Sequence, residues 1–114
     1  SAQAPAPTAP PTTPAALAPA MVTLANNHSG AVTVRLNGQS FQLAPGQIVG
    51  PVAITPAPSG NDEVSVSMAD EYDCGLGDAM DYFPSGATVR FTVTTSRGLC
   101  RSGQPGPDFA VSRA

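Results

Sequence analysis

The densest group of side chains able to do chemistry is an acidic segment over residues 70–81. Its carboxylates and glycines are Asp70, Glu71, Asp73, Gly75, Gly77, Asp78 and Asp81. Ca²⁺ takes several oxygen ligands from a flexible loop, so Asp70, Asp73, Asp78 and Asp81 are the candidate calcium ligands. Their spacing does not match the D-x-D-x-D-G…E calcium loop, and a solvated acidic loop opposite an arginine-bearing surface is the favoured interpretation. Beyond this calcium candidate, the sequence predicts no cofactor.

Catalytic chemistry is not predicted. Paired carboxylates are the machinery of glycoside hydrolases, but a domain confined to residues 21–114 leaves little room for a substrate cleft. The single histidine, His28, lies in the turn-forming run 26–30 and is expected to be solvated. The G-x-S-x-G motif is absent, and one histidine with two cysteines is too few for a zinc, haem or iron–sulfur centre. We therefore expect a protein that is not an enzyme, with no catalytic and no cofactor-binding residues.

Two other kinds of recognition are compatible with the sequence. Tyr72, Tyr82 and Phe83 lie beside the acidic segment and, if exposed, would present aromatic rings to a carbohydrate. The loop 96–107 places basic residues beside Cys100, which is compatible with a loop that a small inhibitor presents to a protease. A ligand-binding module for calcium or a carbohydrate and a protease-inhibitor-like module are therefore the alternatives to a docking protein.

Cys74 and Cys100 are predicted to form a structural disulfide, because an even cysteine count is typical of small exported domains. By the loop-closure argument such a bridge contributes about 3.5 kcal/mol. It also constrains the topology, because disulfide Cα atoms lie within about 7 Å of each other. The strands predicted over 64–69 and 87–95 must then run in the same sense, and residues 75–86 must recross the domain in an extended form. The bridge predicts an extracytoplasmic location, periplasmic or secreted.

From residue 21 onward, apolar and polar side chains alternate with a period of two, which predicts strands. The expected strands cover residues 22–26, 32–36, 41–43, 47–54, 64–68, 87–95 and 109–112. Asn37-Gly38 is the strongest hairpin signal, because both positions of a type I′ turn need a positive φ. No segment sustains an amphipathic helix, and residues 75–82 are expected to form at most one helical turn. About seven short strands predict an all-β fold, a small two-sheet Greek-key or immunoglobulin-like sandwich.

Residues 1–20 differ from the rest of the chain, being rich in Ala and Pro and free of charge. Frequent Pro disfavours helix and central strand and favours polyproline II, in which such a segment reaches about 60 Å. Ala2-Gln3-Ala4 has the A-x-A spacing that signal peptidase leaves. We therefore divide the chain into a disordered or extended tether, residues 1–20, and a β-sandwich domain, residues 21–114.

Charge is segregated along the chain. Residues 1–60 contain only Arg35, residues 61–82 contain seven acids and no base, and residues 83–114 contain four Arg and one Asp, for a net charge of −3. Lys is absent, which argues against a nucleic-acid surface, and no apolar run is long enough to span a membrane.

The uncharged tether and the sparse charge over residues 21–60 indicate surfaces that contact other proteins. We expect a non-enzymatic, extracytoplasmic structural or accessory protein that docks on partner proteins through the tether and the strands of 21–60, as a subunit of a larger assembly. The acidic 61–82 and basic 83–114 segments would permit head-to-tail self-association. An exposed sheet edge would permit strand addition.

Overall fold

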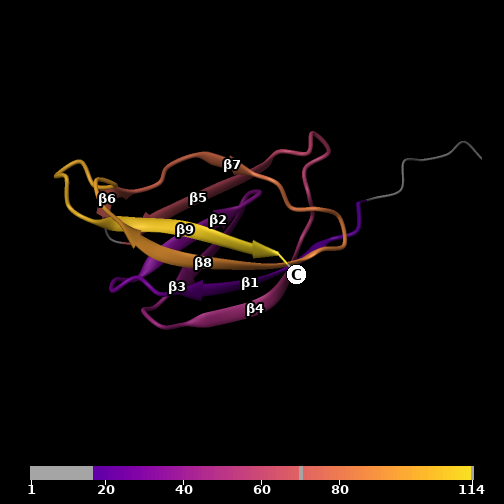
Figure 1. Cartoon of the computed structure of the whole chain (residues 1–114), viewed down its shortest axis with the longest axis horizontal. Helices are drawn as coiled ribbons and strands as arrows, with labels where there is room; N and C mark the ends of the chain where they lie inside the picture. Colours follow the sequence, from indigo (N-terminus) through magenta and orange to yellow (C-terminus); the bar gives the residue numbers. More distant parts are fainter. Residues whose placement is uncertain (1–16, 70, 114) are drawn as a thin grey trace, which may run out of the picture.

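The structure is a computed structural model, which describes residues 17–69 and 71–113. These residues form nine β-strands and no helix, arranged as a four-stranded and a five-stranded sheet packed together (Figure 1). The predicted all-β two-sheet sandwich is confirmed, and the Greek-key or immunoglobulin-like assignment stays a prediction. Within the described residues no helix has the length and apolarity to cross a membrane. Most of the predicted tether, residues 1–16, lies outside the described part.

The first sheet has the strand order β4–β1–β8–β9. Its strands are β1 (Ala20–Asn26), β4 (Ile48–Ile54), β8 (Thr88–Ser96) and β9 (Gly106–Arg113). β1 pairs parallel with β8, whereas the β1–β4 and β8–β9 pairs are antiparallel. On the edge strand β4, Gly50 and Pro51 lie between the residues paired with Val22 and Leu24, which forms a β-bulge. Pro is tolerated there because it cannot donate to a sheet ladder.

The second sheet has the strand order β3–β2–β5–β6, with the short strand β7 also paired to β5. Its strands are β2 (Val32–Leu36), β3 (Gln39–Leu43), β5 (Asp62–Met68), β6 (Glu71–Gly75) and β7 (Ala79–Asp81). All of its pairs are antiparallel. The hairpin between β2 and β3 turns at Asn37 and Gly38, whose φ angles of 47° and 86° confirm the predicted type I′ turn.

The core lies between the two sheets and follows from the period-two alternation of the strands. Along most of β1, β2, β5 and β8, buried residues alternate with exposed or half-buried ones, and the exceptions lie near strand ends, where Ala25 is buried and Thr95 is exposed. The largest fully buried side chains are Phe83, Phe91, Leu24, Leu36, Leu43 and Ile54. Burying this apolar surface between two layers is what holds the sheets together.

The predicted disulfide between Cys74 and Cys100 is present, and the strand directions agree with the constraint drawn from it. β5 and β8 belong to different sheets and run toward the same pole, where the bridge lies (Figure 1). The chain then returns along β5, because β7 pairs antiparallel with residues 62–64. Residues 75–86 therefore recross the domain in an extended form, as predicted.

The sequence underestimated the strand content of residues 71–81. The helical turn that residues 75–82 could have formed is not present, because β7 occupies 79–81 and β6 occupies 71–75. Neither strand shows an apolar alternation, since acidic residues interrupt both. Pairing with β5, together with the disulfide, places these residues in the sheet. The strands are therefore imposed by tertiary contacts.

Candidate functional site

The predicted calcium ligands are not gathered by the described residues. Asp70 lies outside the described part, as does the side chain of Asp73, and Asp78 is exposed. The Asp81 carboxylate is bound by Arg113, with 2.9 Å between Oδ1 and Nη2. Among the described residues, no group of three or more His, Cys, Asp or Glu side chains could hold a metal ion. Calcium binding stays a prediction, and it would require Asp81 to exchange its arginine for a cation.

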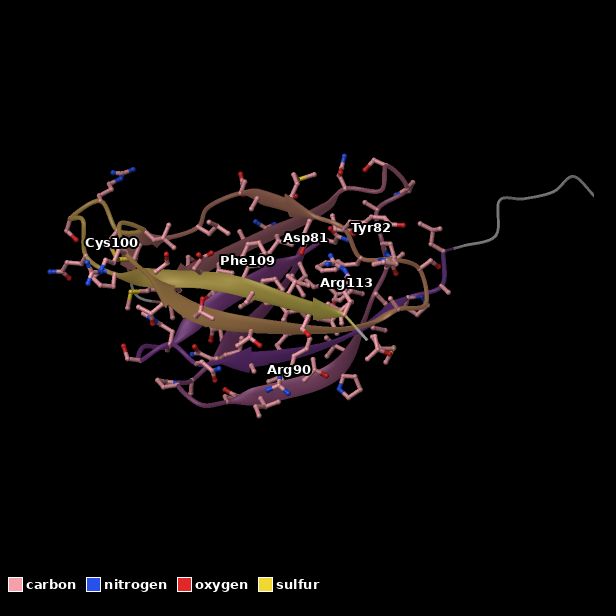
Figure 2. The ribbon with its side chains drawn as sticks, viewed as in Figure 1. Asp81, Tyr82, Arg90, Cys100, Phe109 and Arg113 are labelled. Carbon is pink, nitrogen blue, oxygen red and sulfur yellow. A yellow bond between two sulfur atoms is a disulfide. The ribbon has the colours of Figure 1, made fainter. Side chains whose placement is uncertain are left out.

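Asp81 joins the two sheets on one side of the sandwich. Arg113, near the end of β9, donates to Asp81 in β7 and to the carbonyl oxygen of Tyr82 (Figure 2). β9 also contacts β5 and β6, so the edge strand of the four-stranded sheet packs against this edge of the five-stranded sheet. The Cys74–Cys100 bridge adds a covalent link at the far end of β6. We call this edge, formed by β9 with β6 and β7, the fastened side.

A buried carboxylate that the sequence analysis did not single out organises one pole. Asp62 is fully buried, and its Oδ1 accepts hydrogen bonds from Asn37 Nδ2 at 2.9 Å and the Ala57 amide at 2.6 Å. Its Oδ2 accepts from the Phe83 amide. The sequence could have indicated this burial, because Asp62 lies two residues before the inward-facing Val64 and side chains two residues apart in a strand point to the same face. Two backbone amides and the Asn37 side chain, from three segments of the chain, are thus held by one carboxylate, which has a structural role.

Asn26 has the equivalent role at the opposite pole. Its side-chain nitrogen donates to the carbonyl oxygens of Gly30 at 3.0 Å and Leu43 at 3.1 Å, and its Oδ1 accepts from the His28 amide at 2.9 Å. Its backbone bonds Gly46 and Gln47, in the connection between β3 and β4. Asn26 also has inward strand parity, which is why a polar residue here is buried.

The expectation that His28 is solvated is wrong. The residue is only 5% exposed, because residues 27–31 fold back over the end of β8 and are held there by Asn26. Nδ1 lies 2.8 Å from Thr95 Oγ1, and Nε2 is buried with no hydrogen-bond partner among the described residues. The ring is enclosed by the fold at this pole, and its burial points to a packing role.

The aromatic residues proposed as a carbohydrate platform separate in the structure. Tyr82 is exposed, but Phe83 is fully buried in the core, so the expectation that Phe83 could face a ligand is wrong. The side chain of Tyr72 lies outside the described part. In the loop 96–107, Arg97 and Arg101 are exposed beside the disulfide. Inhibition of a protease by this loop stays a prediction.

The other edge of the sandwich has a different chemistry. Since β9 and β6 lie together on the fastened side, the opposite ends of the two strand orders, β4 and β3, lie together on the other side (Figure 1). The short connection 44–47 joins them. Residues 36–61, which contain both strands, carry no ionisable side chain. We call this edge, formed by β3 and β4, the uncharged side.

Apolar side chains reach the surface on the uncharged side. Ile48 is 62% exposed at the start of β4. Phe41, Val49 and Val52 pack against the core but are only partly covered. Both edge strands lack a neighbour on their outer edge among the described residues. The arrangement is a surface suited to protein contact, and it is the candidate functional site.

Comparison with known proteins gives no relative: no family model, no curated protein and no solved structure matches this chain.

Proposed function

We propose that this protein is a non-enzymatic, extracytoplasmic accessory or structural subunit that docks on partner proteins through its uncharged side. The disulfide agrees with an oxidising location outside the cytoplasm. The proposal includes the tether, which would extend the reach of the docked domain. The uncharged side supports a role in binding a partner protein and not in chemistry on a substrate.

The observation that carries the proposal is the absence of ionisable side chains from two adjacent edge strands. Free sheet edges invite pairing with other chains, and proteins usually protect them with charged residues, Pro, bulges or a covering segment. Here β4 has Pro51 and a bulge, while β3 has none of these protections. An unprotected edge beside the exposed Ile48 is expected where an assembly covers it.

The attachment of the tether supports the same role. The Ala18 carbonyl oxygen accepts hydrogen bonds from the Gly86 amide at 3.2 Å and from Ser85 Oγ at 3.0 Å. The Met21 amide then donates to the Ala87 carbonyl oxygen at 2.8 Å as β1 begins. The chain therefore enters the sandwich at the pole opposite the disulfide. In the proposal, a tether attached at this pole extends the reach of a domain that docks through its uncharged side.

The test uses two equally exposed apolar residues on opposite sides of the domain. Ile48 and Met80 are both 62% exposed, Ile48 on the uncharged side and Met80 on β7 of the fastened side. Ile48→Lys should abolish copurification of partners from the native source, because a desolvated lysine at a contact is costly. Met80→Lys should leave copurification unchanged. Equal loss in both variants, or no loss in Ile48→Lys, would contradict the proposal.

A further inference from the structure

We infer that the free edge of β3 pairs with the β3 edge of a second copy of this chain, so that two five-stranded sheets become one continuous antiparallel sheet. This inference rests on the proposed function and names the partner at one strand of the uncharged side. It follows from the direction of the backbone groups of β3, from the protection of β4, and from the self-complementarity of the resulting register.

The backbone groups of Ser40 and Gln42 point away from the domain. A two-residue type I′ turn makes Leu36 and Gln39 the first hydrogen-bonded pair of the hairpin. Hydrogen-bonded and non-hydrogen-bonded pairs alternate along an antiparallel ladder, so Phe41 also bonds to β2. The N–H and C=O of Ser40 and Gln42 are then directed outward, and β3 pairs with no strand except β2 among the described residues.

β4 is a poorer acceptor than β3, although both are edge strands. Its ladder is interrupted between Val22 and Leu24 of β1, and Pro51 has no amide hydrogen to offer a neighbour. β3 is regular over its whole length and contains no Pro, no bulge and no charge. An added strand would therefore find four usable backbone groups on β3 and an irregular edge on β4.

A second copy of β3 fits this edge in a two-fold symmetric register. Placing Phe41 of each copy opposite Phe41 of the other makes Ser40 of one copy face Gln42 of the other. Both Ser40–Gln42 pairs are then hydrogen-bonded pairs, because each of these residues directs its N–H and C=O outward. The two-fold axis passes between the Phe41 residues, so all four outward backbone groups of each copy are satisfied at once. Such isologous pairing closes as a dimer.

The side chains are compatible with this register on both faces of the sheet. On the inner face, the partly covered Phe41 would lie across from its counterpart as a non-hydrogen-bonded pair, the closest kind of cross-strand neighbour. On the outer face, Ser40 and Gln42 are exposed and uncharged. Arg35 lies on β2, opposite Ser40 of β3. In the joined sheet the two β3 strands separate the two β2 strands, so the Arg35 residues of the two copies lie on strands three spacings, about 14 Å, apart. That separation exceeds the Debye length of about 8 Å at physiological salt.

Hydrogen exchange resolved by NMR tests the register in the wild-type chain. A single edge-to-edge contact is a small interface, so we expect a weak dimer that forms on raising the concentration from about 0.05 to about 1 mM. The Ser40 and Gln42 amides should become more protected over this range, while the Phe41 amide, already bonded within the domain, should not change. The molecular mass should increase toward that of a dimer in sedimentation velocity. A monomer at every concentration, or new protection on β4 alone, would overturn the inference.

Charge insertion gives a second, independent test. Ser40→Lys with Gln42→Lys places four lysines around the two-fold axis and should weaken dimerisation by about tenfold or more. Ser112→Lys with Gln104→Lys is the matched control, with the same residue types exchanged at exposed positions outside β3, and should dimerise as the wild type does. Circular dichroism verifies that each variant is folded.

The two proposals can fail separately. If Ser40 and Gln42 become protected only when native extract is added, the added strand belongs to another protein, which overturns the second-copy inference and leaves the proposed function standing. If the β3 dimer forms but Ile48→Lys loses no cellular partner, the inference stands and the proposed function fails.

Discussion

The two edges of the sandwich are closed in different ways. On the fastened side, the disulfide joins Cys74 of β6 to Cys100 in the connection between β8 and β9, and the Arg113–Asp81 ion pair joins the other end of β9 to β7. On the uncharged side, β3 and β4 have a four-residue connection and the uncharged hydrogen bonds of Asn26. One edge is complete within the chain, and the other exposes a strand edge and apolar side chains.

The two edges also differ in where the few ionisable residues of this small domain lie. Acidic residues gather on β5, β6 and β7, and the last arginine of the chain meets one of them across the sheets. Residues 36–61 have neither sign of charge. Covering a surface without charges costs little desolvation free energy, whereas charged side chains covered by a partner would have to be paired. The charged residues therefore lie on the edge that is linked within the chain, and the edge that is open to a partner has none.

Removing the disulfide should give the largest effect and break the fastened side alone. Cys74→Ala with Cys100→Ala is expected to lower the free energy of unfolding by about 3.5 kcal/mol, because the unfolded chain regains the entropy of an open loop. Urea unfolding measures the loss. Hydrogen exchange should accelerate around residues 74–75 and 97–105 and stay unchanged at 39–54. Equal acceleration on both sides would contradict the separation of the two edges.

Asn26→Ala should give the next largest effect and loosen the uncharged side. The change leaves the carbonyl oxygens of Gly30 and Leu43 and the His28 amide without their side-chain partner, at a cost of about 2–3 kcal/mol. The neighbouring Asn27→Ala removes an exposed amide and should cost almost nothing. Because the lost bonds are uncharged, the difference between the variants should not depend on salt. A difference that disappears at high salt would show that ionic contacts hold this pole.

Arg113→Ala should give the smallest effect. The ion pair is partly exposed, so its loss is expected to cost at most about 1 kcal/mol, and the cost should shrink at high salt. Arg90→Ala is the control, because Arg90 is exposed on β8 and lies apart from Asp81 (Figure 2). Thermal melting at low and high salt measures both. Equal losses for the two variants would mean that the Asp81 contact adds nothing to the fastened side.

The sequence predicted the strands with apolar alternation and the Asn37-Gly38 turn, because each depends on a local pattern. It also predicted the disulfide and the strand directions that the bridge requires, because disulfide Cα atoms must lie close together. β6 and β7 were not, because pairing with β5 imposes them on an acidic segment without alternation. The burial of His28 was missed because it depends on a loop folding onto a strand distant in sequence.

The sparse charge of residues 21–60 was visible in the sequence, but its place in the fold was not. Only the strand order shows that β3 and β4 are the edge strands of different sheets and lie on one side. Asp62 and Asn26 show what strand parity adds, since a polar residue at an inward position near a strand end is a buried hydrogen-bonding centre. Applied to the sequence, that rule would have separated Asp62 from Glu63 and Asp78, which are exposed.

Site-specific photocrosslinking in the native source tests the central claim most directly. The chain has no lysine, and residues 36–61 offer no carboxylate, so a photoreactive phenylalanine analogue placed at residue 48 or at residue 80 replaces amine-reactive reagents. The two positions are equally exposed. We predict defined protein adducts from residue 48 and none above background from residue 80. Adducts from residue 80 alone, or the same adducts from both positions, would contradict docking through the uncharged side.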